Sequence, residues 1–154
     1  MKNSIFTAFI VAILASAGAK AGEIAGPGRF CGYASIIDLI SGEKVTTLRG
    51  GIHGGSFRWD GKFGSLEVLG IGSASRPEGS VVRSGSGTEP QRFAQRRDGK
   101  QFSVAIWNGA NGAAYFNSKK PLTKAQLAAI DRVILFEEGQ TPSDCDLRTV
   151  FSWE

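Results

Sequence analysis

The sequence predicts an α+β domain, with a mainly antiparallel, curved β-sheet of about six or seven strands and one C-terminal helix. Three observations predict this fold: segments that alternate polar and apolar residues, glycine-rich turns between them, and one helix-start pattern late in the chain. With 154 residues, of which 42% are hydrophobic and 21% are charged, the chain has the composition of a single globular domain.

Strand patterns occupy the first half of the chain. Val45–Arg49 has strand composition, and Ser56–Asp60 alternates polar and apolar residues. Gly50–Gly55 lies between these segments and is expected to form a hairpin loop. The Asp60–Gly61 pair then predicts a tight turn into a further strand over Lys62–Ile71.

A second group of strands follows the same pattern. Arg92–Arg97 leads through an Asp98–Gly99 turn into Gln101–Trp107, and Ala113–Asn117 follows as a further strand. Alternation along the middle segment places Trp107 on the face opposite to its aliphatic residues. These segments predict an antiparallel meander.

Two segments are less regular. Phe30–Ile40 mixes aromatic and β-branched residues and is consistent with either a strand or a short helix. Ser73–Gln91 is rich in serine, glycine and proline and is expected to form a long mobile loop. Such a loop is either a tolerated insertion or a flap that contacts a partner.

The helix is expected to begin at Thr123. Gln126 stands three positions later, which is the spacing of a capping box, and Pro121 lies just upstream. The helix is expected to end near Asp131 and to lead into a buried strand over Val133–Phe136. The last predicted strand covers Leu147–Trp153.

The N-terminus has the pattern of a secretory signal peptide. A basic start at Met1–Asn3 precedes an uncharged run over Ile5–Ala17, and Ala19–Ala21 has small residues at its first and last positions, as at a cleavage site. The apolar run is shorter than the roughly 20 residues that span a bilayer. We therefore expect residues 1–21 to be a signal peptide, residues 22–154 to form the domain, and the mature protein to be periplasmic or extracellular with no membrane span.

The two cysteines are expected to pair. Two thiols in an exported chain usually form a disulfide, and a bond between Cys31 and Cys145 would join the start of the domain to its end. With one histidine and no Cys-x-x-Cys pair, the sequence predicts no metal site. No motif indicates a cofactor.

His53 is the single histidine of the chain and lies in the Gly50–Gly55 loop. Glycines on both sides would let a ligand approach the backbone, so Ile52 and His53 are candidate binding residues. His53 is also the one candidate for imidazole catalysis, although the chain has no Gly-x-Ser-x-Gly nucleophile motif. The alternative that involves no ligand and no catalysis is an exposed histidine at a hairpin tip.

Carboxylates offer a second catalytic interpretation. A glycosidase needs two carboxylates roughly 5 to 10 Å apart. Asp38, Asp60 and Glu67 are candidates, and no spacing in the sequence singles out one pair.

Basic residues gather in two places. They indicate either a solvated edge or a cationic face for an acidic partner, lipid headgroups or an anionic polysaccharide. Trp107 is the aromatic candidate for contact with a ligand if its face of the sheet is open. The basic residues are Arg92, Arg96, Arg97 and Lys100 around the second hairpin, and Lys119, Lys120 and Lys124 before the helix.

The sequence therefore predicts a small exported binding module, such as an inhibitor or accessory protein, that engages a protein or surface ligand. The candidate binding residues are Ile52, His53, Arg96, Arg97 and Trp107. The alternative is a small secreted hydrolase that uses His53 or a carboxylate pair. Removal of the predicted signal peptide takes away Lys2 and Lys20, so the formal net charge falls from +4 to +2 (16 − 14). This charge is too weak to indicate nucleic acid as the partner.

Overall fold

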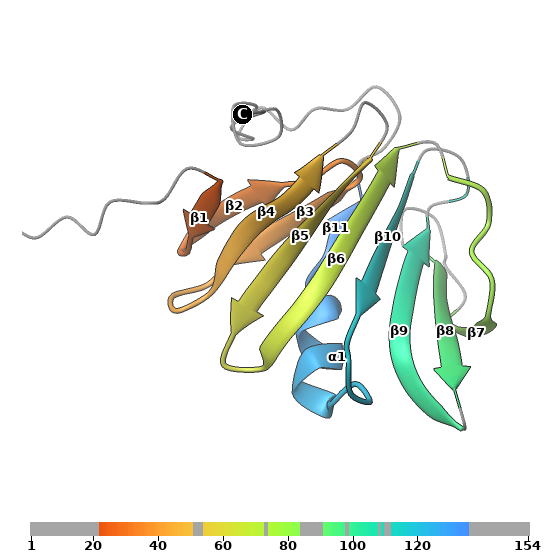
Figure 1. The fold of residues 1–154 in the computed structure, drawn as a ribbon. Coiled ribbons are helices and arrows are strands. Elements are labelled where there is room, and N and C mark those ends of the chain that lie inside the picture. Colours follow the sequence, from red (N-terminus) through yellow and green to blue (C-terminus); the bar gives the residue numbers. More distant parts are fainter. Residues whose placement is uncertain are drawn as a thin grey trace, which may run out of the picture.

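The computed structural model describes residues 22–50, 54–72, 74–83, 91–97, 99–107, 109 and 112–135. These residues form two antiparallel β-sheets and one helix (Figure 1). The predicted signal peptide, Ile52, His53, Cys145 and the predicted strand over Leu147–Trp153 lie outside the described residues.

The larger sheet has eight strands, and every neighbouring pair is antiparallel. Consecutive strands pair from β4 to β6 and from β7 to β10. The edge strand β1 pairs with β4, and β6 pairs with β10 and so joins the two halves. In spatial order the strands are β1 (Glu23–Ala25), β4 (Lys44–Gly50), β5 (Gly54–Gly61), β6 (Gly64–Gly72), β10 (Gly112–Asn117), β9 (Lys100–Trp107), β8 (Gln91–Arg97) and β7 (Ser80–Arg83).

The smaller sheet and the helix lie together on one side of the larger sheet (Figure 1). This sheet has the order β11 (Ile134–Leu135), β3 (Ser35–Leu39) and β2 (Gly28–Cys31). Helix α1 (Lys124–Ile130) immediately precedes β11 in the chain.

The hydrophobic core fills the space between these layers. Alternation along β5 turns Phe57 and Trp59 inward, and both side chains are almost completely buried. The small sheet contributes Phe30 and Ile37, and the helix contributes Ile130. Burial of these large side chains is the main favourable term for folding.

The predicted α+β class, with a mainly antiparallel sheet and one helix, is confirmed, but the predicted strand number is wrong. The described residues contain eleven strands in two sheets rather than six or seven in one. Part of the difference lies in Phe30–Ile40, which contains the end of β2 and all of β3. Three of the four additional strands have four residues or fewer, so they present too few residues for a period-2 pattern to be recognised.

The predicted Asp60–Gly61 turn is also wrong. Gly61 is the last residue of β5 and pairs with Gly64, so the chain reverses at Lys62–Phe63. A Cβ at position 61 would lie 2.7 Å from the Phe63 ring and 2.9 Å from the Glu43 side chain. Gly61 is therefore needed for close packing and not for the turn.

The prediction of one long loop over Ser73–Gln91 is wrong at Ser80–Arg83, which forms the edge strand β7. Residues just before it also pack on the sheet: Pro77 is buried, and the Arg76 guanidinium lies 5.2 Å from the centre of the Phe93 ring. Composition alone did not indicate these contacts.

The predicted helix start is confirmed. The Thr123 hydroxyl accepts a hydrogen bond from the Gln126 backbone N–H, and the Gln126 side chain accepts one from the Thr123 backbone N–H. The helix ends with Asp131 as its C-cap, and β11 follows after a short turn. The predicted split between helix and strand is therefore correct, but the predicted burial of the strand is wrong at Ile134, which is 47% exposed.

Replacing Thr123 with alanine is expected to lower the free energy of unfolding by about 1 kcal/mol, because the capping hydroxyl satisfies a helix N–H that has no other helical partner. Chemical denaturation monitored by circular dichroism measures this loss. Thr123→Ser, which keeps the hydroxyl, is the matched control and is expected to lose much less. Equal losses in the two variants would contradict the capping role.

A buried ion pair joins the helix end to the two sheets. The Arg132 guanidinium donates to Glu43 Oε1 at 2.5 Å and to the Asp38 carbonyl at 3.0 Å. The other Glu43 oxygen accepts from the Ile40 backbone N–H at 3.2 Å. The guanidinium carbon also lies 5.4 Å from the centre of the Trp59 ring.

Cys31 ends β2, is 1% exposed and is not a free thiol. Because Cys145 lies outside the described residues, the Cys31–Cys145 disulfide stays a prediction. Within the part of the chain that the structure describes, no helix has the length and apolar character needed to cross a membrane.

Candidate ligand-binding groove

The outer face of the larger sheet carries a row of polar side chains that crosses neighbouring strands. Arg58 on β5 lies between Thr46 on β4 and Glu67 on β6, and Glu67 in turn lies opposite Asn117 on β10. Side chains at directly opposed positions lie on the same face of a sheet. Phe57, Trp59 and Val68 alternate with this row and point into the core, so the polar row faces outward.

Two cavities lie on this outer face, with volumes of about 580 and 690 Å³. Both are lined by Leu48, Glu67 and Asn117, so they form one groove that runs along the strands. The first end is lined by Arg49, Gly50, Gly54, Gly55, Ser56 and Leu69, and the second by Arg58, Ser65, Ser118, Lys119, Lys120, Pro121, Thr123 and Gln126.

An irregularity in β4 shapes the first end. The register shifts between Thr47, which pairs with Phe57, and Arg49, which pairs with Ser56. Leu48 is the extra residue of this β-bulge, and bulges commonly redirect side chains at binding sites. Both Leu48 and Arg49 consequently line the groove.

The second end is held in place by hydrogen bonds. The backbone N–H groups of Ser118 and Leu122 donate to carbonyls of β9 at 3.0 and 2.8 Å. The Gln126 side-chain amide donates to the Ser65 carbonyl on β6 at 3.1 Å. The loop that carries Lys119 and Lys120 is therefore anchored on both sides.

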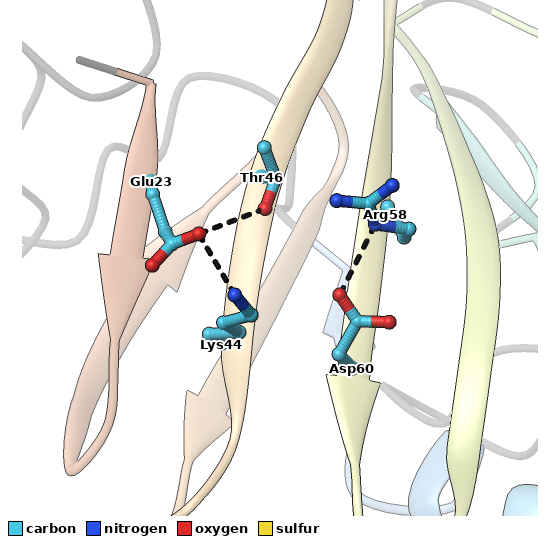
Figure 2. Close-up of polar contacts among 5 residues, drawn as sticks. All are labelled: Glu23, Lys44, Thr46, Arg58 and Asp60. Atoms are coloured by element: carbon cyan, nitrogen blue, oxygen red, sulfur yellow. Dashed lines mark hydrogen bonds and ion pairs between the residues drawn. The ribbon is translucent and has the colours of Figure 1, made fainter. Parts of the chain in front are cut away.

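Ion pairs neutralise Lys44 beside the groove and Arg58, which lines its second end. Figure 2 shows Glu23 on β1 in contact with Lys44 and Thr46 on β4, and Arg58 in contact with Asp60 on β5. The ion-pair distances are 3.0 Å for Lys44–Glu23 and 3.1 Å for Arg58–Asp60.

Three other cations that line the groove differ from Arg58 in this respect. No acidic side chain of the described residues lies within ion-pair distance of Arg49, Lys119 or Lys120. Glu67 is the one acidic residue among those that line the groove. The residues that line the groove therefore carry more positive than negative charge, and most of the excess lies at the second end.

The predicted Gly50–Gly55 loop adjoins the first end of the groove. Gly50 and Gly54 line the groove and flank the chain positions of Ile52 and His53, which lie outside the described residues. Gly55 has a different role from the one predicted, because a Cβ at this position would collide with the Tyr33 ring. This glycine admits an aromatic side chain of the protein itself.

Trp107 lies farther along the same face, on β9. Its indole N–H donates to the Ala74 carbonyl at 3.0 Å, and its ring packs edge-to-face on Phe93 with centroids 6.2 Å apart. Residues Ala74–Pro77 thus lie against this part of the outer face. Trp107 is partly buried and does not line the groove.

The basic residues noted in the sequence have different surroundings where the structure describes them. Arg92 forms an ion pair with Asp131 at the end of the helix, and the Arg96 and Arg97 side chains lie outside the described residues. Lys119 and Lys120 instead join Arg58 at the groove. The pairing of β6 with β10 makes this possible.

Of the three carboxylates considered for catalysis, two lie close together and one lies apart. Asp60 and Glu67 occupy diagonal positions on the outer face of β5 and β6, because Asp60 pairs with Ser65 and Arg58 pairs with Glu67. Asp38 lies on the smaller sheet, where the hydrogen bond from the Arg29 guanidinium holds the pKa of its carboxyl below the ordinary value. Asp60 and Glu67 lie on the larger sheet, and Asp60 is paired with Arg58. Tyr115, beside Leu69 on the outer face, has a phenol pKa raised by burial.

Sequence reasoning missed Arg49, Leu48 and Asn117 as groove residues. Arg58 was predictable as an outward-facing residue, because polar and apolar residues alternate over Ser56–Asp60. The positions of Arg49 and Leu48 depend on the bulge, and that of Asn117 depends on the β6–β10 pairing. Neither feature has a local sequence signature.

No protein family, curated protein or solved structure matches this chain. In the described part of the chain, no group of three histidine, cysteine or acidic side chains is arranged to hold a metal ion.

Proposed function

We propose that this protein is a small exported binding or accessory module that engages a ligand through the groove on the outer face of its larger sheet. The observation that carries this proposal is the pair of cationic groove ends, formed by Arg49 at one end and by Lys119 and Lys120 at the other. An excess of positive charge in a cleft raises the local concentration of anionic ligands.

The rigidity of the site also supports binding. The groove floor is formed by β5 and β6, each of which is paired with a strand on both sides. The Lys119–Lys120 loop is anchored to β9 and β6 by hydrogen bonds. A preformed site binds with a smaller loss of conformational entropy than a site that must first become ordered.

Export is supported by the basic start, the apolar run and the small residues at Ala19 and Ala21. A periplasmic or extracellular location is consistent with a disulfide between Cys31 and Cys145. Comparison of the intact mass before and after reduction tests the disulfide, because the oxidised protein is lighter by two hydrogen atoms.

The secreted hydrolase is the alternative. A mechanism with two carboxylates would use Asp60 and Glu67, which occupy diagonal positions on the outer face, whereas Asp38 lies on the other sheet. This mechanism is less favoured than binding, because Asp60 is ion-paired with Arg58. A histidine mechanism requires His53. Loss of turnover in His53→Ala, with ligand retention unchanged, would favour the hydrolase.

The binding proposal is tested by retention of ligands from extracellular and envelope extracts of the source on the immobilised protein. The double variant Lys119→Ala/Lys120→Ala is expected to retain about tenfold less ligand, because it removes two exposed cations from one end of the groove. Lys62→Ala/Lys100→Ala removes the same charge away from the groove and is expected to retain the wild-type amount. Retention that is equal in all three proteins contradicts the groove as the binding site.

A further inference from the structure

We propose that the groove binds an acidic polysaccharide, a sugar chain whose carboxylates are separated by hydroxyl-bearing carbons. This inference rests on the proposed function and names its ligand class. The observations that lead to it are the length of the groove, the spacing of its charges, the neutral groups between them and its place on the sheet.

The groove suits an elongated ligand. It extends along β5 from Gly54 to the level of Ser65, which pairs with Asp60. Six residue steps along a strand correspond to about 20 Å. A ligand that contacts both ends must therefore be several sugar units or a comparable chain in length.

The charges alternate along the groove. Arg49 lies at the first end and Lys119 and Lys120 at the second. Glu67 lies between them on β6, opposite Arg58 on β5, which is already paired with Asp60. Cations at the ends favour anionic groups there, whereas Glu67 repels an anionic group placed at the centre. A carboxylate accepts hydrogen bonds, so Glu67 favours hydroxyl groups at that position.

The remaining lining groups also suit hydroxyl groups. Ser56, Ser65, Asn117 and Ser118 contribute hydroxyl and amide groups, which both donate and accept hydrogen bonds. Leu48 supplies an aliphatic surface that is 45% exposed. This mixture matches a chain that carries many hydroxyls and spaced carboxylates.

Nucleic acid fits the groove less well. Single strands are held by aromatic side chains that stack on bases, and the described lining residues include none. A phosphate on every nucleotide would also bring negative charge to Glu67.

An acidic peptide fits less well for a different reason. Extended peptides commonly bind by adding a strand to the open edge of a sheet. The groove lies on the face formed by β5 and β6, whose backbone groups already pair with strands on both sides. A peptide in this groove would therefore find no unpaired strand with which to form backbone hydrogen bonds.

The test measures binding of the purified protein to polygalacturonate oligomers by isothermal titration calorimetry. The fully methyl-esterified oligomer of equal length keeps most hydroxyls but has no free carboxylates, and is expected to bind at least tenfold more weakly. Poly-L-glutamate and an oligothymidylate of equal charge are the competing polyanions. Each is expected to bind at least tenfold more weakly than polygalacturonate.

Three variants locate the site. Lys119→Ala/Lys120→Ala is expected to weaken polygalacturonate binding about tenfold, whereas Lys62→Ala/Lys100→Ala is expected to change it less than twofold. Glu67→Gln is expected to weaken it about threefold, because a charged acceptor for hydroxyl groups is lost. Thermal unfolding monitored by circular dichroism checks that each variant remains folded.

The outcomes separate the two proposals. Equal binding of the methyl ester, of poly-L-glutamate or of the oligothymidylate would overturn the polysaccharide assignment, as would tighter polygalacturonate binding by Glu67→Gln. If polygalacturonate does not bind but the extract ligand is still lost with Lys119→Ala/Lys120→Ala, the ligand class is wrong and the binding function stands. If that variant affects neither ligand, both proposals fail.

Discussion

Replacing Phe57 with alanine is expected to lower the free energy of unfolding by about 3–5 kcal/mol, the range for large aromatic residues in protein cores. Phe57 is 1% exposed and lies between the two sheets. Its ring meets Phe30 edge-to-face with centroids 4.8 Å apart, and it stacks on Tyr33 at 6.3 Å. Truncation removes these contacts and leaves a cavity that the surrounding strands fill only in part.

Denaturant titration of Phe57→Ala measures this loss, followed by circular dichroism and by tryptophan fluorescence. Ile40→Ala is the control, because Ile40 is 56% exposed and its truncation is expected to cost less than about 1 kcal/mol. A loss below about 1 kcal/mol for Phe57→Ala would show that the two sheets do not pack through this residue.

The second large effect is expected for Glu43→Ala, with a loss of about 3 kcal/mol. Removal of one partner from a buried ion pair leaves the other charge without compensation. The Glu43 side chain is 5% exposed and that of Arg132 is 33% exposed, so solvent reduces the cost to the lower part of the usual 3–5 kcal/mol range. The variant also removes the acceptor of the Ile40 backbone N–H.

A double-mutant cycle with Arg132→Met tests whether the pair is responsible. The loss in Glu43→Ala/Arg132→Met is expected to be smaller than the sum of the two single losses, because the double variant holds no uncompensated charge. Asp60→Ala breaks the more exposed Arg58–Asp60 pair and is expected to cost less than about 1 kcal/mol. Additive losses in the cycle would contradict the proposed coupling.

Local patterns predicted the elements whose signals lie within a few neighbouring residues. The capping box at Thr123 and Gln126 correctly predicted the helix start, because both hydrogen bonds form within one turn. The alternation of Ser56–Asp60 correctly predicted a half-buried strand. The Asp60–Gly61 turn was predicted wrongly because glycine has two uses, positive φ and close packing, and Gly61 serves the second.

The groove was only partly predictable. Lys119 and Lys120 were recognised as a basic group, and Glu67 as a candidate carboxylate, but nothing in the sequence placed them together. Their proximity requires β10 to pair with β6 across an intervening stretch that contains β7, β8 and β9. Hairpins have turn signatures, whereas the pairing of distant strands has none.

By itself, the sequence determined the α+β class, most of the longer strands, the helix limits and the inward alternation of the core, because each depends on residues close together in the chain. The tertiary structure alone decided the two-sheet arrangement, the packing of Ala74–Pro77 near Trp107 and the union of Arg49, Glu67 and Lys119 in one groove. These features arise from strand order and from the fit of side chains between layers. Both are set by the free energy of the whole packed domain and not by any one segment.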